Sequence, residues 1–265
     1  MKIAHVSQFT AVDAATDPEA FAVCMDAVAT CDGIDTGRRF VAERLALRPG
    51  AALLDLGCGT GDQTRALAPQ VVPGGRALGM DLSQTMIGEA RRRAAAGDLP
   101  VEFEVGDAQS LPFADATFDA CRTERMLIHV PDPRAALAEM VRVTRPGGRV
   151  GVIDADTETM VFDSVDRPLT RRVVAAFADS FQNGWIARQL PRLMTEAGLT
   201  ELTVEPYVLS FRPPVTATIL DAHLAAMVAA GALTDEESSR WGTEVIDRAL
   251  IPALMTMVAV VGVKS

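Results

Sequence analysis

Cysteine is scarce in this chain, and its four cysteines are scattered. Cys24, Cys31, Cys58 and Cys121 form no C-x-x-C pair. A zinc site or a chemistry based on clustered thiols needs such spacing, so we expect neither, and we expect no metal. Two of the cysteines fall in a predicted strand or in the turn that follows one. The sequence therefore predicts buried, reduced thiols rather than a disulfide framework.

Positive charge is also scarce. The 265 residues include 25 lysines and arginines against 35 acidic residues, which gives a net charge of −10. A protein that binds tRNA, rRNA or DNA needs a basic footprint, and no basic stripe is present here. We therefore expect a small-molecule substrate and no nucleic-acid partner.

Long apolar segments are missing as well. Residues 1–20 lack the apolar core of a signal peptide, and the most apolar stretch, 249–263, contains Pro252 and is too short to span a bilayer. No internal repeat is present. We expect a cytoplasmic protein without a membrane partner, as a monomer or homodimer. A hydrophobic content of 49% over this length suffices for one α/β domain with a subsidiary cap.

The most informative stretch is an apolar run, 51–56, that leads into glycines at alternate positions, Gly57, Gly59 and Gly61. This pattern predicts a buried parallel strand and a turn in which glycine lets the backbone approach a ligand. The polar segment 62–68 predicts a helix whose free N–H groups face that turn. The G-x-G-x-G spacing differs from the G-x-G-x-x-G of dinucleotide-binding folds, which disfavours a nicotinamide oxidoreductase. Three glycines alone are equally compatible with a merely tight turn.

Four further apolar runs each end in a polar tip. They are 76–80 before Asp81, 101–105 before Gly106-Asp107-Ala108, 117–121 before Arg122-Thr123-Glu124, and 149–153 before Asp154-Ala155-Asp156. An acidic residue at the tip of the second strand is well placed to accept hydrogen bonds from two ribose hydroxyls.

Together these segments resemble the class I S-adenosylmethionine-dependent methyltransferases, in particular the small-molecule branch that includes the quinone-biosynthesis methyltransferases. The resemblance rests on DLGCGTG, GMD, GDAQSLPF, FDA and RPGG in this order, and it covers roughly residues 38–211 and the terminal strand. It implies an α/β fold with a Rossmann-like seven-stranded sheet of order 3-2-1-4-5-7-6, strand 7 antiparallel, and helices on both faces. It also implies S-adenosylmethionine as cofactor and S-adenosylhomocysteine as product.

The resemblance assigns cofactor contacts residue by residue. It implies that Asp107 accepts from the exocyclic amine of adenine while Ala108 N–H donates to a ring nitrogen; a turn role for Asp107 is the alternative. Met86 is equally compatible with an adenine contact and with helix packing. Arg38 could pair with the methionine carboxylate, or belong to a solvated helix face. The predicted cofactor-binding set is Arg38, Asp55, Gly57, Cys58, Gly59, Gly61, Asp81, Leu82, Met86, Gly106, Asp107, Ala108, Arg122 and Thr123.

Three segments outside the sheet are predicted to complete the single domain, 1–265. Residues 1–47 form helices that close over the cofactor. Residues 157–190 and 215–250 are predicted to be helical cap insertions over a small-molecule pocket, with plain packing insertions as the alternative.

The expected reaction is methyl transfer to an O, N or C nucleophile of a small metabolite. Because the cofactor's methyl group is already electrophilic, the enzyme mainly holds the nucleophile in line, and a general base is optional. His129 is the leading candidate base, and the alternative is that it orders the turn at Val130 and Pro131. Glu124, Asp154 and Asp156 are further candidates by topology, and Tyr207 is also compatible with a core position. The motifs do not exclude a protein of the same fold that binds the cofactor and catalyses a cyclisation.

Overall fold

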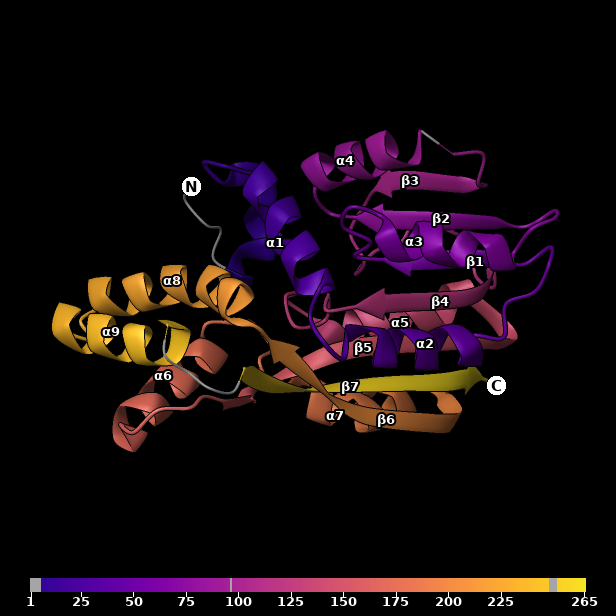
Figure 1. Ribbon diagram of the computed structural model, residues 1–265. Helices are drawn as coiled ribbons and strands as arrows, with labels where there is room; N and C mark the ends of the chain where they lie inside the picture. Colours follow the sequence, from indigo (N-terminus) through magenta and orange to yellow (C-terminus); the bar gives the residue numbers. More distant parts are fainter. Residues whose placement is uncertain (1–5, 96, 248–251) are drawn as a thin grey trace.

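The computed structural model describes residues 6–95, 97–247 and 252–265. A seven-stranded sheet of order β3-β2-β1-β4-β5-β7-β6 runs through its centre (Figure 1). The strands are β1 (Ala52–Leu56), β2 (Arg76–Asp81), β3 (Val101–Val105), β4 (Phe118–Glu124), β5 (Thr144–Val161), β6 (Leu199–Phe211) and β7 (Ala253–Lys264). Strands β1 to β5 pair in parallel, and β7 lies antiparallel between β5 and β6. The predicted sheet order and the antiparallel last strand are confirmed.

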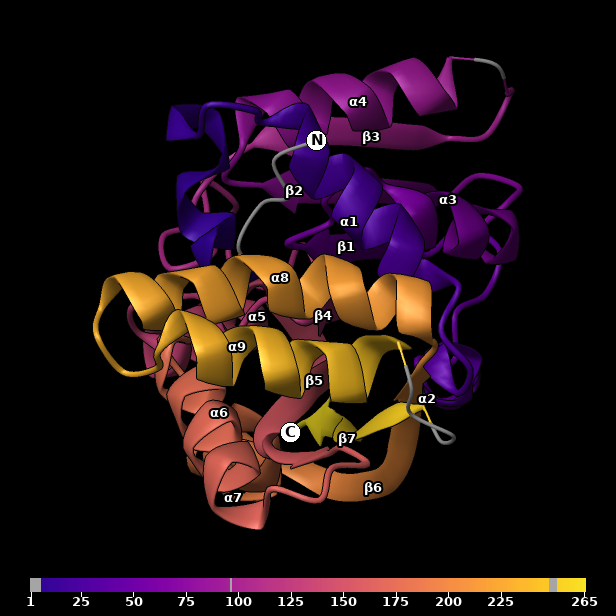
Figure 2. The same cartoon turned by 60° about the vertical axis from the view of Figure 1, so that its left-hand side comes forward.

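Helices cover both faces of the sheet (Figures 1 and 2). On one face lie α2 (Ile34–Arg44), α3 (Asp62–Leu67) and α4 (Gln84–Ala94), and on the other lie α5 (Pro133–Val143) and α7 (Ile186–Glu196). Strand β1 is buried almost throughout, as expected for a parallel strand covered on both sides, whereas Phe103 is the only buried residue of the edge strand β3. The core therefore lies around β1, β4, β5 and β7.

A 3₁₀ segment, η1 (Val6–Ala14), and helix α1 (Glu19–Ala29) cross the end of the sheet at which β1 and β2 finish. Asp13 fastens this segment to α4, because its carboxylate accepts from Ser83 Oγ at 2.6 Å, Gln84 N at 2.8 Å and Thr85 N at 3.1 Å. Desolvation opposes ionisation, but these hydrogen bonds lower the pKa of Asp13 to about 2. A carboxylate at a helix N-terminus is favoured because it satisfies free N–H groups.

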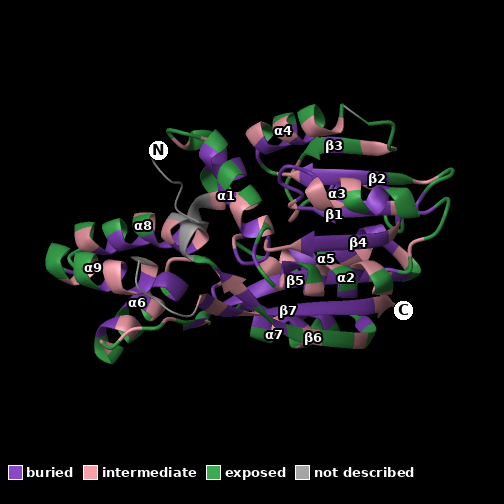
Figure 3. Ribbon diagram, viewed as in Figure 1, coloured by how far each residue is buried: buried purple, intermediate pink, exposed green. Residues whose placement is uncertain are grey.

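Helices α6 (Arg167–Asp179), α8 (Pro213–Ala229) and α9 (Asp235–Gly242) gather beyond the same end of the sheet (Figure 1). Their inward faces are buried and their outward faces exposed (Figure 3). They share a hydrophobic cluster separate from the main core, whose largest member, Trp241, donates from Nε1 to Thr170 Oγ1 at 2.9 Å. These helices form the cap of the molecule.

Three predicted boundaries were wrong. The fifth strand was predicted over 149–153, but β5 continues to Val161 because β7 pairs with it as far as Asp156 and again at Val161; residues 157–161 are therefore strand and not cap helix. The segment predicted over 157–190 does not end at 190, because helix α7 begins at Ile186 and continues to Glu196. The segment predicted to be helical over 215–250 is interrupted: α8 ends at Ala229, and α9 ends at Gly242 and continues as a π-helical turn, Thr243–Asp247; residues 248–250 lie outside the described residues.

Candidate active site

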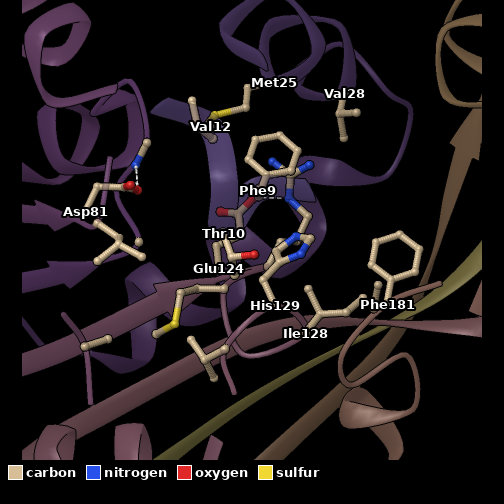
Figure 4. Close-up of a pocket in the computed structure, with 18 of the residues that line it drawn as sticks. Phe9, Thr10, Val12, Met25, Val28, Asp81, Glu124, Ile128, His129 and Phe181 are labelled. Carbon is tan, nitrogen blue, oxygen red and sulfur yellow. Dashed lines mark hydrogen bonds and ion pairs between the residues drawn. The ribbon is translucent and has the colours of Figure 1, made fainter. Parts of the chain in front are cut away.

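A cavity opens at the carboxyl ends of β1, β2 and β4, where the order of the strands reverses. Residues of η1, α1 and the cap line its other side. Figure 4 shows Asp81 at one side of the cavity and His129, Ile128 and Phe181 at the opposite side, with Phe9 and Glu124 between them. The Asp81 end is lined by Gly57, Gly59, Asp81, Leu82, Met86, Gly106, Asp107, Ala108 and Gln109. The cap end is lined mostly by apolar side chains, among them Val28, Ile128, Met160, Phe177, Phe181, Leu209, Phe211, Ile219 and Met255.

The glycine turn after β1 has the left-handed backbone that the sequence predicts. Gly57 has φ +63° and Gly59 has φ +53°, and both line the cavity. A Cβ on Gly59 would lie 2.2 Å from Met25 Cε, so α1 packs directly on the turn. Cys58 points away from the cavity and packs with Ile87 and Phe103, where burial raises the pKa of its thiol well above the usual value. It is a core residue.

Asp81, at the tip of β2, is tied to this turn. Its Oδ2 accepts from Gly59 N and its Oδ1 from Ser83 N, both at 2.9 Å. Burial raises the pKa of Asp81, while these N–H groups oppose the shift. Each carboxylate oxygen keeps a further lone pair, which is what the predicted ribose contact requires.

The predicted adenine end also lines the cavity. Met86 faces the cavity and also packs with Val12 and Phe21, so it takes part in helix packing whatever its role toward a ligand. The carboxylate of Asp107 accepts from Gln109 N at 2.8 Å and from Gln109 Nε2 at 3.1 Å. The turn role foreseen for Asp107 is therefore present, and its contact with adenine stays a prediction.

A chain of ion pairs runs beneath the cavity. Asp55 accepts from Thr64 Oγ1 at 2.7 Å and from Arg122 Nη1 at 2.8 Å, and Arg122 Nη2 donates to Glu124 Oε2 at 2.9 Å. Arg38 completes the chain by donating to Glu124 from Nη2 at 2.9 Å and from Nε at 3.1 Å. The sequence predicts either a contact with the methionine carboxylate or a solvated helix face for Arg38, but in the structure its guanidinium, which is 14% exposed, pairs with Glu124.

Glu124 itself lines the cavity at the tip of β4. Although burial opposes it, Arg125, Arg38 and Arg122 hold the pKa of Glu124 at about 2. A carboxylate held ionised at this level is a poor general base near neutral pH. Glu124 therefore anchors arginines rather than removing a proton.

Several predicted cofactor residues shape the turn without reaching the cavity wall. Thr123 donates from Oγ1 to Leu56 O at 2.8 Å, and Gly61, with φ +75°, begins α3 against Phe103. Within the described parts of the chain, the predicted residues that do not line the cavity are Arg38, Asp55, Cys58, Gly61, Arg122 and Thr123. Among them, Asp55, Arg122 and Thr123 make hydrogen bonds between neighbouring strand tips.

His129 lies in the cavity between two phenylalanines. Its ring centroid is 5.3 Å from that of Phe9 and 5.7 Å from that of Phe181, and its Nδ1 is buried without a hydrogen-bond partner among the described residues. Burial, and then the positive charge of Arg125, lower the pKa of His129 to about 3. The imidazole is therefore neutral near pH 7 and weakly basic, which favours a packing or hydrogen-bonding role.

Two polar side chains, the partly buried Asn183 and the buried Asp154, hold the segment that carries His129. Asn183 donates from Nδ2 to Leu127 O at 2.9 Å and to Val130 O at 2.7 Å. Beneath the segment, Asp154 accepts from Ile128 N at 3.1 Å, and burial raises its pKa to about 7. Asp154 does not line the cavity, so this candidate base is a positioning residue.

The other two candidates from the sequence, Asp156 and Tyr207, do not line the cavity. Asp156 pairs with Arg188, whose Nη2 donates to its Oδ1 at 2.6 Å. Tyr207 is a buried member of the main core, as the alternative prediction had it, and burial raises its pKa above its ordinary value.

Sequence reasoning missed Phe9, Phe181 and the side chain of Arg125, all of which line the cavity. Phe9 and Phe181 stand in segments without a motif, so no local signal marks them. Arg125 could have been noticed, because a basic residue directly after a strand tip faces the ligand-binding edge of a parallel sheet.

The comparisons with known proteins agree with this geometry. Residues 54–152 match a family described as a methyltransferase domain. The chain is 40% identical over 222 residues to an uncharacterized 37.1 kDa protein in transposon TN4556 of Streptomyces fradiae, a match that covers 82% of this chain and 64% of that protein, just under two thirds of its length. It is 33% identical over 180 residues to a demethylmenaquinone methyltransferase of Bacillus cytotoxicus, covering 61% of this chain and 75% of that enzyme.

Solved structures show the same fold. The YcgJ protein of Bacillus subtilis superposes with a TM-score of 0.63 at 18% identity, over 87% of this chain and 98% of that one. The [4+2]-cyclase SpnF superposes with a TM-score of 0.56 at 25% identity, over 87% of this chain and 81% of that one. The glycine turn, the carboxylate at the tip of β2 and the sequence relatives together place the protein: the chain belongs to the class I S-adenosylmethionine-dependent methyltransferases, in the small-molecule branch that includes the demethylmenaquinone methyltransferases.

Proposed function

We propose that this chain transfers the methyl group of S-adenosylmethionine to an O, N or C nucleophile of an apolar small molecule. The observation that carries the proposal is one continuous cavity with two chemically different ends. A glycine turn and Asp81 at one end suit a nucleoside that carries hydroxyls. Phenylalanine, leucine and methionine side chains at the other end suit an apolar acceptor.

When bound, the cofactor supplies an electrophilic methyl group on a sulfonium. The residues of the chain then have to bind the cofactor and the acceptor, orient one toward the other, and exclude water from between them. Asp81, which the Gly59 N–H fixes in place, would hold the nucleoside end, and Phe177 and Phe181 would keep water from the other end. Holding two reactants in line lowers the barrier by about 7 to 11 kcal/mol in favourable cases, so this positioning is sufficient catalysis for a good nucleophile.

The ionisable groups of the site support an acceptor that needs no enzyme base. His129 is neutral with a pKa of about 3, and Glu124 is held ionised by three arginines. Asp154, with a pKa of about 7, has both carboxylate oxygens bound to backbone N–H groups beneath the loop. An acceptor that ionises in solution, or a neutral amine, fits such a site.

The remaining features of the proposal concern partners. The net charge of −10 supports a small-molecule acceptor rather than a nucleic acid. We further propose that the protein works in the cytoplasm, as a monomer or homodimer. Within the described residues no helix is long and apolar enough to cross a membrane.

A second candidate is a cyclisation in which the cofactor is bound but not consumed. The similarity to a [4+2]-cyclase supports this candidate, because a cyclase that binds the cofactor would need the same cofactor-binding motifs as a methyltransferase. The two candidates differ in stoichiometry: a methyltransferase forms one S-adenosylhomocysteine per product. An acceptor converted without S-adenosylhomocysteine would establish the cyclase instead.

Calorimetric titration with S-adenosylhomocysteine tests cofactor binding without knowledge of the acceptor. Asp81→Ala should weaken binding by about 2 to 4 kcal/mol, because charged hydrogen bonds to the ribose are lost. Asp98→Ala is the matched control, since Asp98 is exposed and does not line the cavity. Undiminished affinity in a folded Asp81→Ala variant would contradict the proposed site.

A further inference from the structure

Arg125 lines the cavity directly after β4. Its backbone has φ +54°, in the left-handed region that residues other than glycine rarely adopt, and its N–H donates to Ile153 O at 2.8 Å. Such a conformation persists only where the surrounding structure holds it. The strand tip therefore fixes the direction in which this side chain leaves the sheet, and the side chain lines the cavity.

The guanidinium of Arg125 lacks the partners that its neighbours have. Its Nε is buried without a hydrogen-bond partner among the described residues, and its ion-pair contact, Glu124 Oε1, is 3.6 Å from that Nε. Glu124 already accepts hydrogen bonds from Arg38 and Arg122, and Asp55 accepts from Arg122. The guanidinium groups of Arg38, Arg122 and Arg125 thus face only two carboxylates, those of Asp55 and Glu124. The excess positive charge falls on Arg125, because it has the weakest contact with them.

Other ionisable groups near Arg125 do not neutralise it. Burial raises the pKa of Asp154 to about 7, so this carboxyl is only partly ionised near neutral pH, and both of its oxygens accept from backbone N–H groups rather than from Arg125. Burial raises the pKa of the Cys24 and Cys31 thiols, which therefore remain neutral. Burial also raises the pKa of Tyr207, so its hydroxyl stays neutral. Arg125 therefore shares its one carboxylate contact, Glu124, with two other arginines, and an arginine with such incomplete charge compensation in an apolar cavity is suited to an anionic ligand.

The positive charge of Arg125 is directed to the cap end of the cavity. It acts on Cys24 of α1, on Cys31 just after that helix, and on His129, which lies between Phe9 and Phe181. The ionisation of Asp81, at the nucleoside end, is governed by burial and by other groups. In Figure 4, His129 and Phe181 lie on the side of the cavity away from Asp81, and Glu124 lies between.

We propose that Arg125 forms an anion subsite for the methyl acceptor, so that the acceptor is an apolar molecule carrying one carboxylate or ionised hydroxyl. This proposal rests on the proposed function, because it assigns the cap end of the cavity to the acceptor. The planar guanidinium suits an anionic oxygen group, and the apolar walls around it strengthen the attraction by excluding water. Val28, Ile128 and Phe181 would contact the apolar body of the acceptor.

The test measures binding of two probes that differ only in charge, biphenyl-4-carboxylate and biphenyl-4-carboxamide. Both are titrated by calorimetry into protein saturated with S-adenosylhomocysteine. Wild type should bind the carboxylate about tenfold or more tightly than the carboxamide, the size expected for one charge-assisted pair in an apolar site. Arg125→Met should abolish this preference and leave the affinity for the carboxamide unchanged. Arg39→Met should keep the preference, because Arg39 is exposed on α2.

Arg125→Gln, which keeps a polar side chain, carries the same expectation and replaces Arg125→Met if thermal unfolding shows that the latter does not fold. Equal affinity of wild type for the two probes would overturn the proposal, as would a preference that survives both substitutions. A loss of S-adenosylhomocysteine affinity in Arg125→Met with the probe preference intact would place Arg125 at the cofactor and also overturn it. Failure of wild type to bind S-adenosylhomocysteine would instead overturn the proposed function, and it is measured separately.

Discussion

The side-chain amide of Asn183 donates to the carbonyl oxygen of Val130 at 2.7 Å, which ties the loop between α6 and α7 to the segment that follows β4. The backbone N–H of Asn183 adds a bond to Ile128 O at 2.9 Å. His129 lies between these two anchor points. The cap therefore holds this wall of the cavity through one asparagine, and a change at Asn183 should reach the site without touching a ligand.

Asn183→Ala should loosen residues 127–130. Loss of two partly buried hydrogen bonds should lower the free energy of unfolding by about 1 to 3 kcal/mol, because two carbonyl oxygens lose their donor. Hydrogen exchange followed by mass spectrometry should show faster exchange of the Ile128 and His129 amides, while affinity for S-adenosylhomocysteine stays near wild type. Gln182→Ala, at the neighbouring residue, is the control. Unchanged protection of both amides would show that Asn183 does not hold the segment.

Asp13→Asn should release the N-terminal segment from α4. The asparagine keeps the shape of the side chain but loses the charge that three donors at the start of α4 stabilise. We expect S-adenosylhomocysteine to dissociate severalfold faster, since Phe9, Thr10 and Val12 of this segment line the cavity. Stopped-flow displacement measures the rate, with Asp221→Asn on the exposed face of α8 as control. Equal dissociation rates in the two variants would mean that the segment does not retain the ligand.

His129→Ala should alter the pH dependence of stability. The pKa of His129 is about 3 in the folded protein, against an ordinary value of 6.5 for a solvated histidine, so the unfolded chain binds the proton first as the pH falls. The contribution of neutral His129 is therefore complete above pH 6.5 and is lost progressively between pH 6.5 and 3. Chemical denaturation of wild type should show a steeper loss of stability over this interval than His129→Ala. Parallel curves would refute the low pKa.

The same variant tests catalysis once an acceptor is known. A neutral, weakly basic imidazole should give no ionisation near its ordinary pKa of 6.5 in the rate profile of wild type. Turnover of His129→Ala should fall much less than the ~10²-fold expected for loss of a general base. A rate limb in wild type with an apparent pKa near 6.5 that disappears in the variant would restore His129 as the base.

Much of the fold could be predicted from the sequence, because the patterns that indicate its strands and turns are local. Each apolar run with its polar tip became a strand, and Gly57 and Gly59 adopted the positive φ that their spacing indicates. The tip residue Asp81 lies on the cavity for the same reason: parallel strands bring their carboxyl ends to one edge. The strand ends were less readable, since the length of β5 depends on its pairing with β7 from the far end of the chain.

The residues of the site could be predicted only in part, because tertiary structure determines which charged side chains form ion pairs. Arg38 and Glu124 are 86 positions apart, and nothing in either local sequence indicates their pair. Once Arg38 is committed to Glu124, the excess positive charge falls on Arg125. Phe9 and Phe181 likewise meet His129 only through folding. Sequence patterns located the nucleoside end of the cavity, and packing determined the acceptor end.

The pair of Arg38 and Glu124 gives the last prediction, a double-mutant cycle. Glu124→Gln should lower the free energy of unfolding by about 3 to 5 kcal/mol, because it leaves buried guanidinium groups without their shared carboxylate. The side chains of Arg38 and Glu124 are 14% and 6% exposed, so solvent screens the pair little. Arg38→Met alone should cost less, since Glu124 keeps its hydrogen bond from Arg122 at 2.9 Å.

The double variant should be more stable than the sum of the single losses predicts, because Arg38→Met removes one of the cations that Glu124→Gln strands. A coupling free energy of about 1 to 3 kcal/mol is expected for residues in one ion-pair network. Urea denaturation of the four proteins measures it. The exposed pair of Arg192 and Glu196 on α7, at 2.9 Å, is the control cycle and should couple by no more than about 0.5 kcal/mol. Additive losses at Arg38 and Glu124 would show that the two side chains act independently, and the excess charge would then not fall on Arg125.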